Sequence, residues 1–205
     1  GSDYSLDLRV PFASSDAEDG EMTMTASAST LKGTFAADLS FRNAPAEKLL
    51  EVFFSDETAL SFRAPMNGDV NAAGTLTTGL DALVLNLSFG QGELRFRDHV
   101  LPVEKIALKA EHDIAAHQMK IVDLDYGLGG VTGRLHGILG YDAMGPGISA
   151  LNFELEGPSV RIDLPAVFES MLPIGEHRLA GIYKIPERTV EVNSVSVKLF
   201  DTVLS

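Results

Sequence analysis

One order of elements occurs twice along the chain: alternating strand-like residues, a proline-led amphipathic segment, and a glycine that opens the next strand-like stretch. Equivalent residues are Phe41 and Phe153, Phe53 and Phe168, and Gly68 and Gly181, at offsets of 112 to 115 residues. An internal repeat of this kind predicts a modular β-rich fold. We therefore expect two related halves, residues 1–80 with a first β-helix-β repeat and residues 81–205 with a second.

A second repeat has an offset of 71 residues. Met119, Ile121, Leu124, Tyr126 and Leu128 correspond to Val190, Val192, Val195, Val197 and Leu199. In both segments every second residue is apolar until one extra residue intervenes. Such a slip is typical of a β-bulge, so we expect a kinked strand pair to be used more than once.

Period-two alternation dominates the middle of the chain and predicts strands whose two faces differ. Residues 83–89 place one leucine or phenylalanine at every second position, the turn residues 90–92 follow, and residues 93–97 alternate again. This pattern predicts a hairpin with an apolar face. The apolar candidates are Leu83, Leu85, Leu87, Phe89, Leu94 and Phe96.

Two short amphipathic helices are expected between the strands. In the first, Asn43 is a suitable N-cap, Pro45 suits the first turn, and Leu49, Leu50 and Phe53 form an apolar stripe. In the second, Asp163 precedes a stripe of Val167, Phe168, Met171 and Leu172, and Pro173 ends the helix. We expect each helix to cover an end of the sheet as an ordinary core helix.

Composition excludes several classes of protein. The 205 residues include no Cys, which removes disulfides, zinc-thiolate sites and cysteine nucleophiles. The net charge of −13 disfavours nucleic acid and electrostatic docking on anionic lipid headgroups. Gly1-Ser2 resembles a remnant of cloning. We therefore expect a piece of a longer protein, with a membrane anchor outside these residues.

No pattern of catalytic residues stands out, and we expect no enzyme, no cofactor and no metal. His112, Asp113 and His117 are close in sequence, but the stretch reads as a polar turn between strands. Asp123 and Asp125 share one strand face and read as its solvated side. Residues 127–130 are glycine-rich but lack the helix and lysine of a phosphate loop.

The chain resembles the AsmA-like proteins of Gram-negative envelopes, a family with TamB-like and YhdP-like members. The resemblance rests on short repeated strand motifs, covers residues 80 to 205 well and is looser before them. The motifs are Gly92–Phe96, Leu101–Val103, Ile106–Ala110, Met119–Leu128, Gly129-Gly130 and Leu135–Gly137.

The resemblance implies a long, curved antiparallel β-sheet with an apolar trough, located in the periplasm and anchored to the inner membrane. It also implies a part in moving phospholipids and in outer-membrane biogenesis. The trough candidates are the six apolar residues of 83–96, and the partners are phospholipid acyl chains and neighbouring repeats of the full-length protein. Those six residues fit a closed core equally well. The alternative is therefore a structural or protein-interaction β-scaffold without lipid binding.

Overall fold

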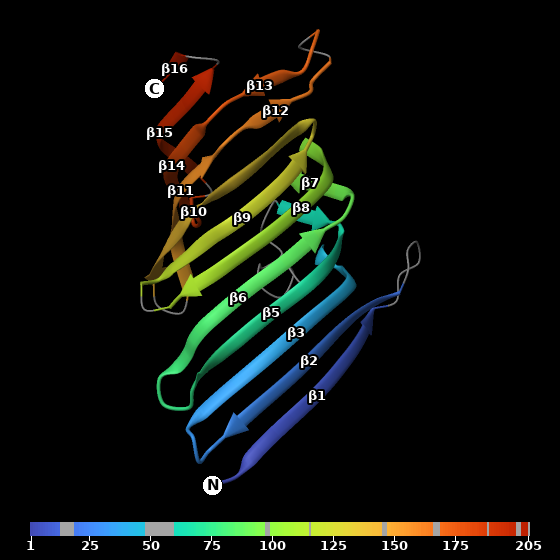
Figure 1. Cartoon of the computed structure of the whole chain (residues 1–205), viewed down its shortest axis with the longest axis vertical. Helices are drawn as coiled ribbons and strands as arrows, with labels where there is room; N and C mark the ends of the chain where they lie inside the picture. Colours follow the sequence, from blue (N-terminus) through green and yellow to red (C-terminus); the bar gives the residue numbers. More distant parts are fainter. Residues whose placement is uncertain are drawn as a thin grey trace. The chain divides into compact units, whose positions relative to one another are not determined.

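The computed structural model describes residues 1–12, 19–47, 60–96, 99–114, 116–144, 147–165, 169–187, 189–199 and 202–204. The strands that they form are paired antiparallel (Figure 1), and Ala46 and Glu47, next to the residues left out, have helical backbone. The chain divides into two compact units, Gly1–Leu108 and Lys109–Ser205. The expected mainly β, antiparallel fold is confirmed.

The first unit is an open sheet in the order β1-β2-β3-β5-β6-β8, in which β4 pairs with β7 and β7 with β8. Its strands are β1 (Asp3–Phe12), β2 (Gly20–Ser29), β3 (Thr34–Pro45), β4 (Leu60–Arg63), β5 (Pro65–Thr75), β6 (Gly79–Phe89) and β7 (Gly92–Phe96). Strand β8 (His99–Asp113) carries the chain into the second unit.

The second unit has the order β9-β10-β11-β14-β15-β16, and β12 pairs with β10 and with β13. Its strands are β9 (Gln118–Leu128), β10 (Val131–Met144), β11 (Gly147–Gly157), β12 (Val160–Ile162), β13 (Leu172–Ile174), β14 (His177–Lys184), β15 (Thr189–Leu199) and β16 (Thr202–Leu204).

The expected bulges are present in both segments of the 71-residue repeat. Ile121 and Leu124 of β9 pair with Gly137 and Leu135, so two residues of β9 oppose one of β10 between these pairs. Val192 and Val195 of β15 pair in the same way with Gly181 and Leu179. The slip in the apolar pattern therefore marks a real irregularity of the ladder in each segment.

The longer repeat also has a structural counterpart. Phe41 pairs with Gly68, and Phe153 pairs with Gly181, so the repeated phenylalanine and glycine are cross-strand neighbours in both passages. The compact units divide after Leu108, whereas the sequence repeat predicts two halves that divide at residue 80. The relationship between two sequence halves stays a prediction.

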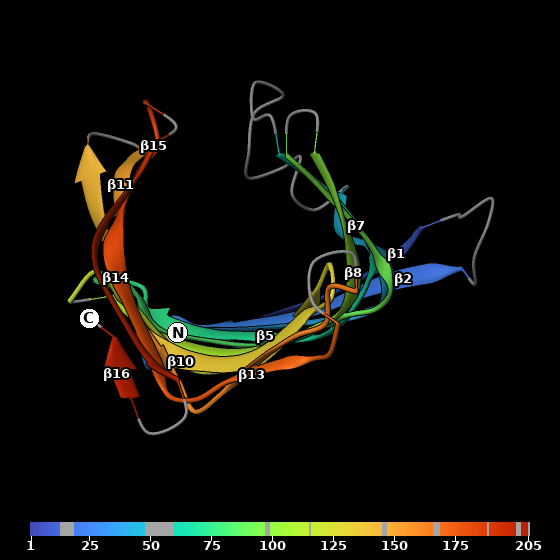
Figure 2. The same cartoon turned by 90° about the horizontal axis from the view of Figure 1, so that it is seen from above.

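Long strands of each unit bend along their length (Figure 2). Gly68 of β5 and Gly137 of β10 have φ angles of 131° and 152°, which residues with a Cβ rarely adopt. Each faces a bulged stretch, β3 at Phe41 and Ala44, and β9 at Ile121 and Leu124. Bulges with glycine opposite them bend and twist antiparallel strands.

The two expected helices are not confirmed. Asn43 and Pro45, expected as cap and first turn, belong to strand β3, and Asn43 has a φ of 49°. The apolar stripe of Leu49, Leu50 and Phe53 falls in 48–59, outside the described residues.

The second helix prediction is wrong where it can be compared. Leu172 and Pro173 lie in β13, paired with Ile162 and Arg161, and Met171 is 52% exposed. Val167 and Phe168 fall outside the described residues. A helix this short has little stability in isolation. The pairing of β12 with β13 instead provides backbone N–H and C=O groups with hydrogen-bond partners across the ladder. Among the described residues no helix has the length and apolar character needed to cross a membrane.

Candidate functional site

One face of the first unit is apolar across five neighbouring strands, β1, β2, β3, β5 and β6. Its cross-strand rows are Val10, Met22, Phe41, Gly68 and Leu87; Leu8, Met24, Leu39, Val70 and Leu85; Leu6, Ala26, Ala37, Ala72 and Leu83; and Tyr4, Ala28, Phe35, Gly74 and Leu80. We call these four rows the first unit's apolar face. The strict alternation of the sequence puts them all on one side of the pleat.

The side chains of this face are only partly shielded. Tyr4, Leu6 and Leu8 at the edge are 61%, 52% and 45% exposed, and the leucines of β6 are half-buried. Among the described residues, no large side chain is fully buried. A closed β-core would bury most of such residues completely, so the described part of this sheet presents an open apolar surface.

Four of the six trough candidates lie side by side on this side of strand β6. Leu83, Leu85 and Leu87 stand opposite Ala72, Val70 and Gly68 of β5. Phe89, the fourth, stands opposite Met66. The alternation along β6, half-buried leucines between exposed neighbours such as Val84, matches the expected division of faces. Whether these residues hold a ligand stays a prediction.

The other two candidates belong to β7. Leu94 is half-buried and pairs with Phe62 of β4, whose ring contacts Phe89 edge-to-face with centroids 5.1 Å apart. Phe96 ends β7 opposite Leu60, and its side chain lies outside the described part of the structure.

Sequence reasoning missed the small buried cluster beside these candidates. Met66 and Phe62 are 5% and 8% exposed, and Ala44, which pairs with Met66, is also buried. The signal was present in β5, where Met66 continues the alternation of Gly68, Val70 and Ala72. The apolar face is therefore bordered, near Phe89, by a small group of packed apolar side chains.

The opposite face of the first unit is polar and tied by cross-strand contacts. Glu21 of β2 forms ion pairs with Arg9 of β1 and with Arg42 of β3, and Nη2 of Arg42 lies 3.2 Å from Oε2 of Glu21. Asn71 donates to Asp38 at 2.6 Å. Such exposed contacts contribute little stability individually but mark this side as the solvated one.

In each unit, an aromatic ring packs over a glycine of the neighbouring strand. A Cβ added at Gly74 would lie 2.7 Å from Cζ of Phe35, and one added at Gly181 would lie 2.6 Å from Cζ of Phe153. The ring of the neighbouring strand thus lies over bare backbone. This arrangement keeps the apolar rows continuous where a side chain is missing.

The second unit, taken by itself, also has an apolar side. Its rows are Met119, Leu139, Phe153, Gly181 and Val192, and Ile121, Gly137, Leu155, Leu179 and Val195. Val192 and Val195 on β15 are 53% and 49% exposed. The pattern of open apolar rows is therefore a property of each unit.

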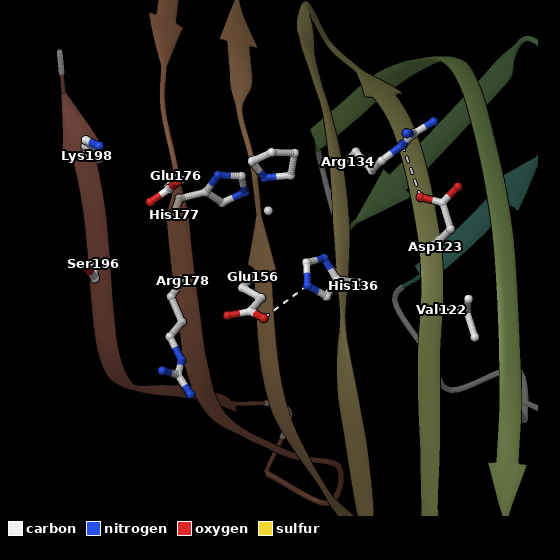
Figure 3. Close-up of a pocket in the computed structure, with 12 residues that line it drawn as sticks. Val122, Asp123, Arg134, His136, Glu156, Glu176, His177, Arg178, Ser196 and Lys198 are labelled. Atoms are coloured by element: carbon white, nitrogen blue, oxygen red, sulfur yellow. Dashed lines mark hydrogen bonds and ion pairs between the residues drawn. The ribbon is translucent and has the colours of Figure 1, made fainter.

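The other side of the second unit holds a shallow cavity of about 650 Å³ lined by charged side chains (Figure 3). His136 lies 3.0 Å from Glu156, and Arg134 lies 3.1 Å from Asp123 (Figure 3). Asp123, expected on the solvated side, thus forms an exposed ion pair. The charges are mixed and no group of three or more potential metal ligands converges in the described residues.

The expected turn joins β8 and β9, but His112 belongs to β8 and is half-buried rather than solvated. Asp113 accepts a hydrogen bond from the Ala116 N–H at 3.0 Å, which closes the turn. His112 and His117 both stack on Tyr141, with ring centroids 5.6 and 5.4 Å from it. Since Nε2 of His112 also lies 3.0 Å from the Tyr141 hydroxyl, these rings support the hairpin.

Comparison with known proteins gives no match: no family model, no curated protein and no solved structure is similar to the chain.

Proposed function

We propose that the chain is a non-enzymatic module that holds phospholipid acyl chains on its apolar sheet face. The observation that carries the proposal is the first unit's apolar face, an open set of apolar rows with partly exposed side chains. Contiguous exposed apolar surface is rare on soluble proteins unless a ligand, membrane or partner covers it.

The size of the face suits an acyl chain. Strands lie roughly 4.8 Å apart and alternate residues about 6.8 Å apart, so four rows on five strands span about 20 Å each way. Half of a roughly 30 Å hydrocarbon core is about 15 Å, which is the depth that one acyl chain fills. One chain therefore fits along or across the face.

The expected affinity is modest. A buried methylene contributes about 0.8 kcal/mol, and a chain lying on an open face loses roughly half of its water contact. About 14 methylenes at about 0.4 kcal/mol give nearly 6 kcal/mol, a Kd of roughly 0.1 mM for one chain. This range suits a surface that passes lipid on rather than storing it.

The resemblance to AsmA-like proteins supports the cellular side of the proposal. In that setting the module lies in the periplasm, belongs to a longer protein anchored in the inner membrane, and takes part in phospholipid transport and outer-membrane biogenesis. Absence of Cys fits an oxidising compartment.

The test is native mass spectrometry with lipid extraction on protein purified from a Gram-negative host without detergent. We expect the wild type to carry phospholipid, either co-purified or taken up from added lipid, and Leu85→Asp to carry none. The matched control is Val84→Asp, because Val84 is the next residue of β6, is 43% exposed, and points to the polar side. Circular dichroism establishes that both variants fold.

A second candidate is a structural scaffold without lipid binding, favoured by exposed edges such as Val190 of β15, which is 60% exposed. A lipid-free mass for the wild type, with no uptake of added phospholipid, would favour this scaffold. Equal lipid loss in the Leu85→Asp and Val84→Asp variants would also contradict binding on the apolar face.

A further inference from the structure

Strand β1 ends the strand order of the first unit, and β2 is its partner among the described strands. It is ten residues long, and its side chains alternate between apolar and polar. Its apolar residues Tyr4, Leu6 and Leu8 are the most exposed of the first unit's apolar face. A long, exposed edge strand of this kind is a template for pairing with another strand.

The backbone groups of β1 that face the free edge can be identified from one contact. The Thr30 N–H donates to the Ser2 carbonyl at 3.0 Å, and Ser2 and Thr30 continue the register in which Asp3 stands opposite Ser29. In an antiparallel ladder, residues alternate between bonding one neighbour and the other. Even-numbered residues of β1 therefore bond β2, and odd-numbered ones point their N–H and C=O outward.

The outward-pointing residues are Asp3, Ser5, Asp7, Arg9 and Pro11. Since Pro11 has no N–H, it limits the usable ladder to the first four. A second β1 running antiparallel about a two-fold axis at Leu6 uses all four, pairing Asp3 with Arg9 of the other copy and Ser5 with Asp7 of the other copy. Each such pair exchanges two backbone hydrogen bonds.

Charge selects this register over its neighbours. The two neighbouring registers that use the same outward-pointing groups are centred on Ser5 and on Asp7. The first places Asp3 opposite Asp7 of the other copy, and the second places Asp7 opposite Asp7. Like charges directly opposite each other are destabilising. In the register centred on Leu6, Asp3 of each copy stands opposite Arg9 of the other copy, which gives two pairs of opposite charge. Arg9 is 72% exposed even though it contacts Glu21, so its guanidinium remains accessible to a second carboxylate.

We propose that two copies of this chain pair through β1 in an antiparallel two-fold dimer centred on Leu6. In this dimer Tyr4 stands opposite Leu8 and Leu6 opposite Leu6, with their side chains on the same side of the joined ladder. The apolar rows of the first unit thus continue from one copy into the other. The proposal is independent of what the apolar face binds.

The test is analytical ultracentrifugation of the whole chain and its charge variants. We expect a reversible dimer whose Kd rises about tenfold in Asp3→Arg, because two attractive pairs become repulsive. Arg9→Asp has the same effect, with Glu21 still held by Arg42. Mixing the two single variants restores dimerisation, because both cross-strand pairs then join an arginine of one copy to an aspartate of the other. The control is Asp7→Arg, which faces Ser5 of the other copy and leaves the Kd within about threefold.

Amide hydrogen exchange gives a second readout that does not depend on variants. On dilution to the monomer, amides of Ser5, Asp7 and Arg9 lose protection, whereas those of Leu6 and Leu8 keep it. A monomer at all concentrations, a complex with a different polypeptide on β1, or a dimer unaffected by Asp3→Arg would overturn the proposal.

Discussion

Replacing Gly137 with alanine tests the claim that the bends of the sheet depend on glycine. Gly137 has a φ of 152°, and an added Cβ would lie 2.0 Å from the carbonyl oxygen of Glu154 and 2.9 Å from Cα of Leu155. Such a backbone conformation costs a residue with a side chain about 1 to 3 kcal/mol. Relieving the contact requires β10 and β11 to separate locally, which forfeits one or two hydrogen bonds at about 1 kcal/mol each.

The expected loss for Gly137→Ala is therefore about 2 to 5 kcal/mol of unfolding free energy, a large part of the roughly 5 to 15 kcal/mol of a typical domain. Urea unfolding followed by far-ultraviolet circular dichroism measures it, since the chain has no Trp. With a slope of about 2 kcal/mol/M, the urea midpoint falls by roughly 1 to 2.5 M.

Gly140 in the same strand is the matched control. A Cβ there would lie 3.7 Å from Cβ of Asn152, an ordinary contact. Gly140→Ala should be neutral or stabilise by about 0.5 kcal/mol, because alanine loses less conformational freedom on folding. Equal effects of the two substitutions, or a loss below about 1 kcal/mol for Gly137→Ala, would refute the reasoning.

The other predictions concern the first unit's bend, its polar face and the half-buried phenol of Tyr126. Gly68→Ala should cost as much as Gly137→Ala, because an added Cβ would lie 2.0 Å from the carbonyl oxygen of Asn86 at a φ of 131°; urea unfolding checks this. Glu21→Gln should lose about 1 kcal/mol, and less at high salt, since Arg9 and Arg42 are exposed partners. Burial raises the pKa of the Tyr126 phenol above its ordinary 10.0, so stability is complete below pH 10 and falls as pH rises further, when the unfolded chain deprotonates first. Tyr126→Phe should lose less stability on going to alkaline pH, as unfolding at several pH values would show.

The strands and their faces were predictable because a period of two is a strong, local signal. Leu83, Leu85 and Leu87 share a face for the reason their spacing suggests, and the extra residue between Ile121 and Leu124 does mark a bulge. Pairing order within the sheets could not be predicted, because it depends on contacts between residues distant in sequence.

The segment at Leu172 shows where local pattern misleads. A proline-led apolar run is compatible with a helix or a short strand, and the pairing of β13 with β12 decides in favour of the strand. Phe62 was missed as a neighbour of Phe89 because β4 pairs with β7, a strand distant from it in sequence. The charged cavity at His136 had no sequence signal, since its residues come from separate strands.

The most direct test of lipid contact on the first unit's apolar face is paramagnetic broadening of methyl NMR signals by a phospholipid spin-labelled on its acyl chain. We expect the signals of Leu83, Leu85 and Leu87 to broaden strongly and that of Val84, on the opposite side of the same strand, to remain sharp. Equal broadening of Val84 and Leu85, or no broadening of either, would contradict the account.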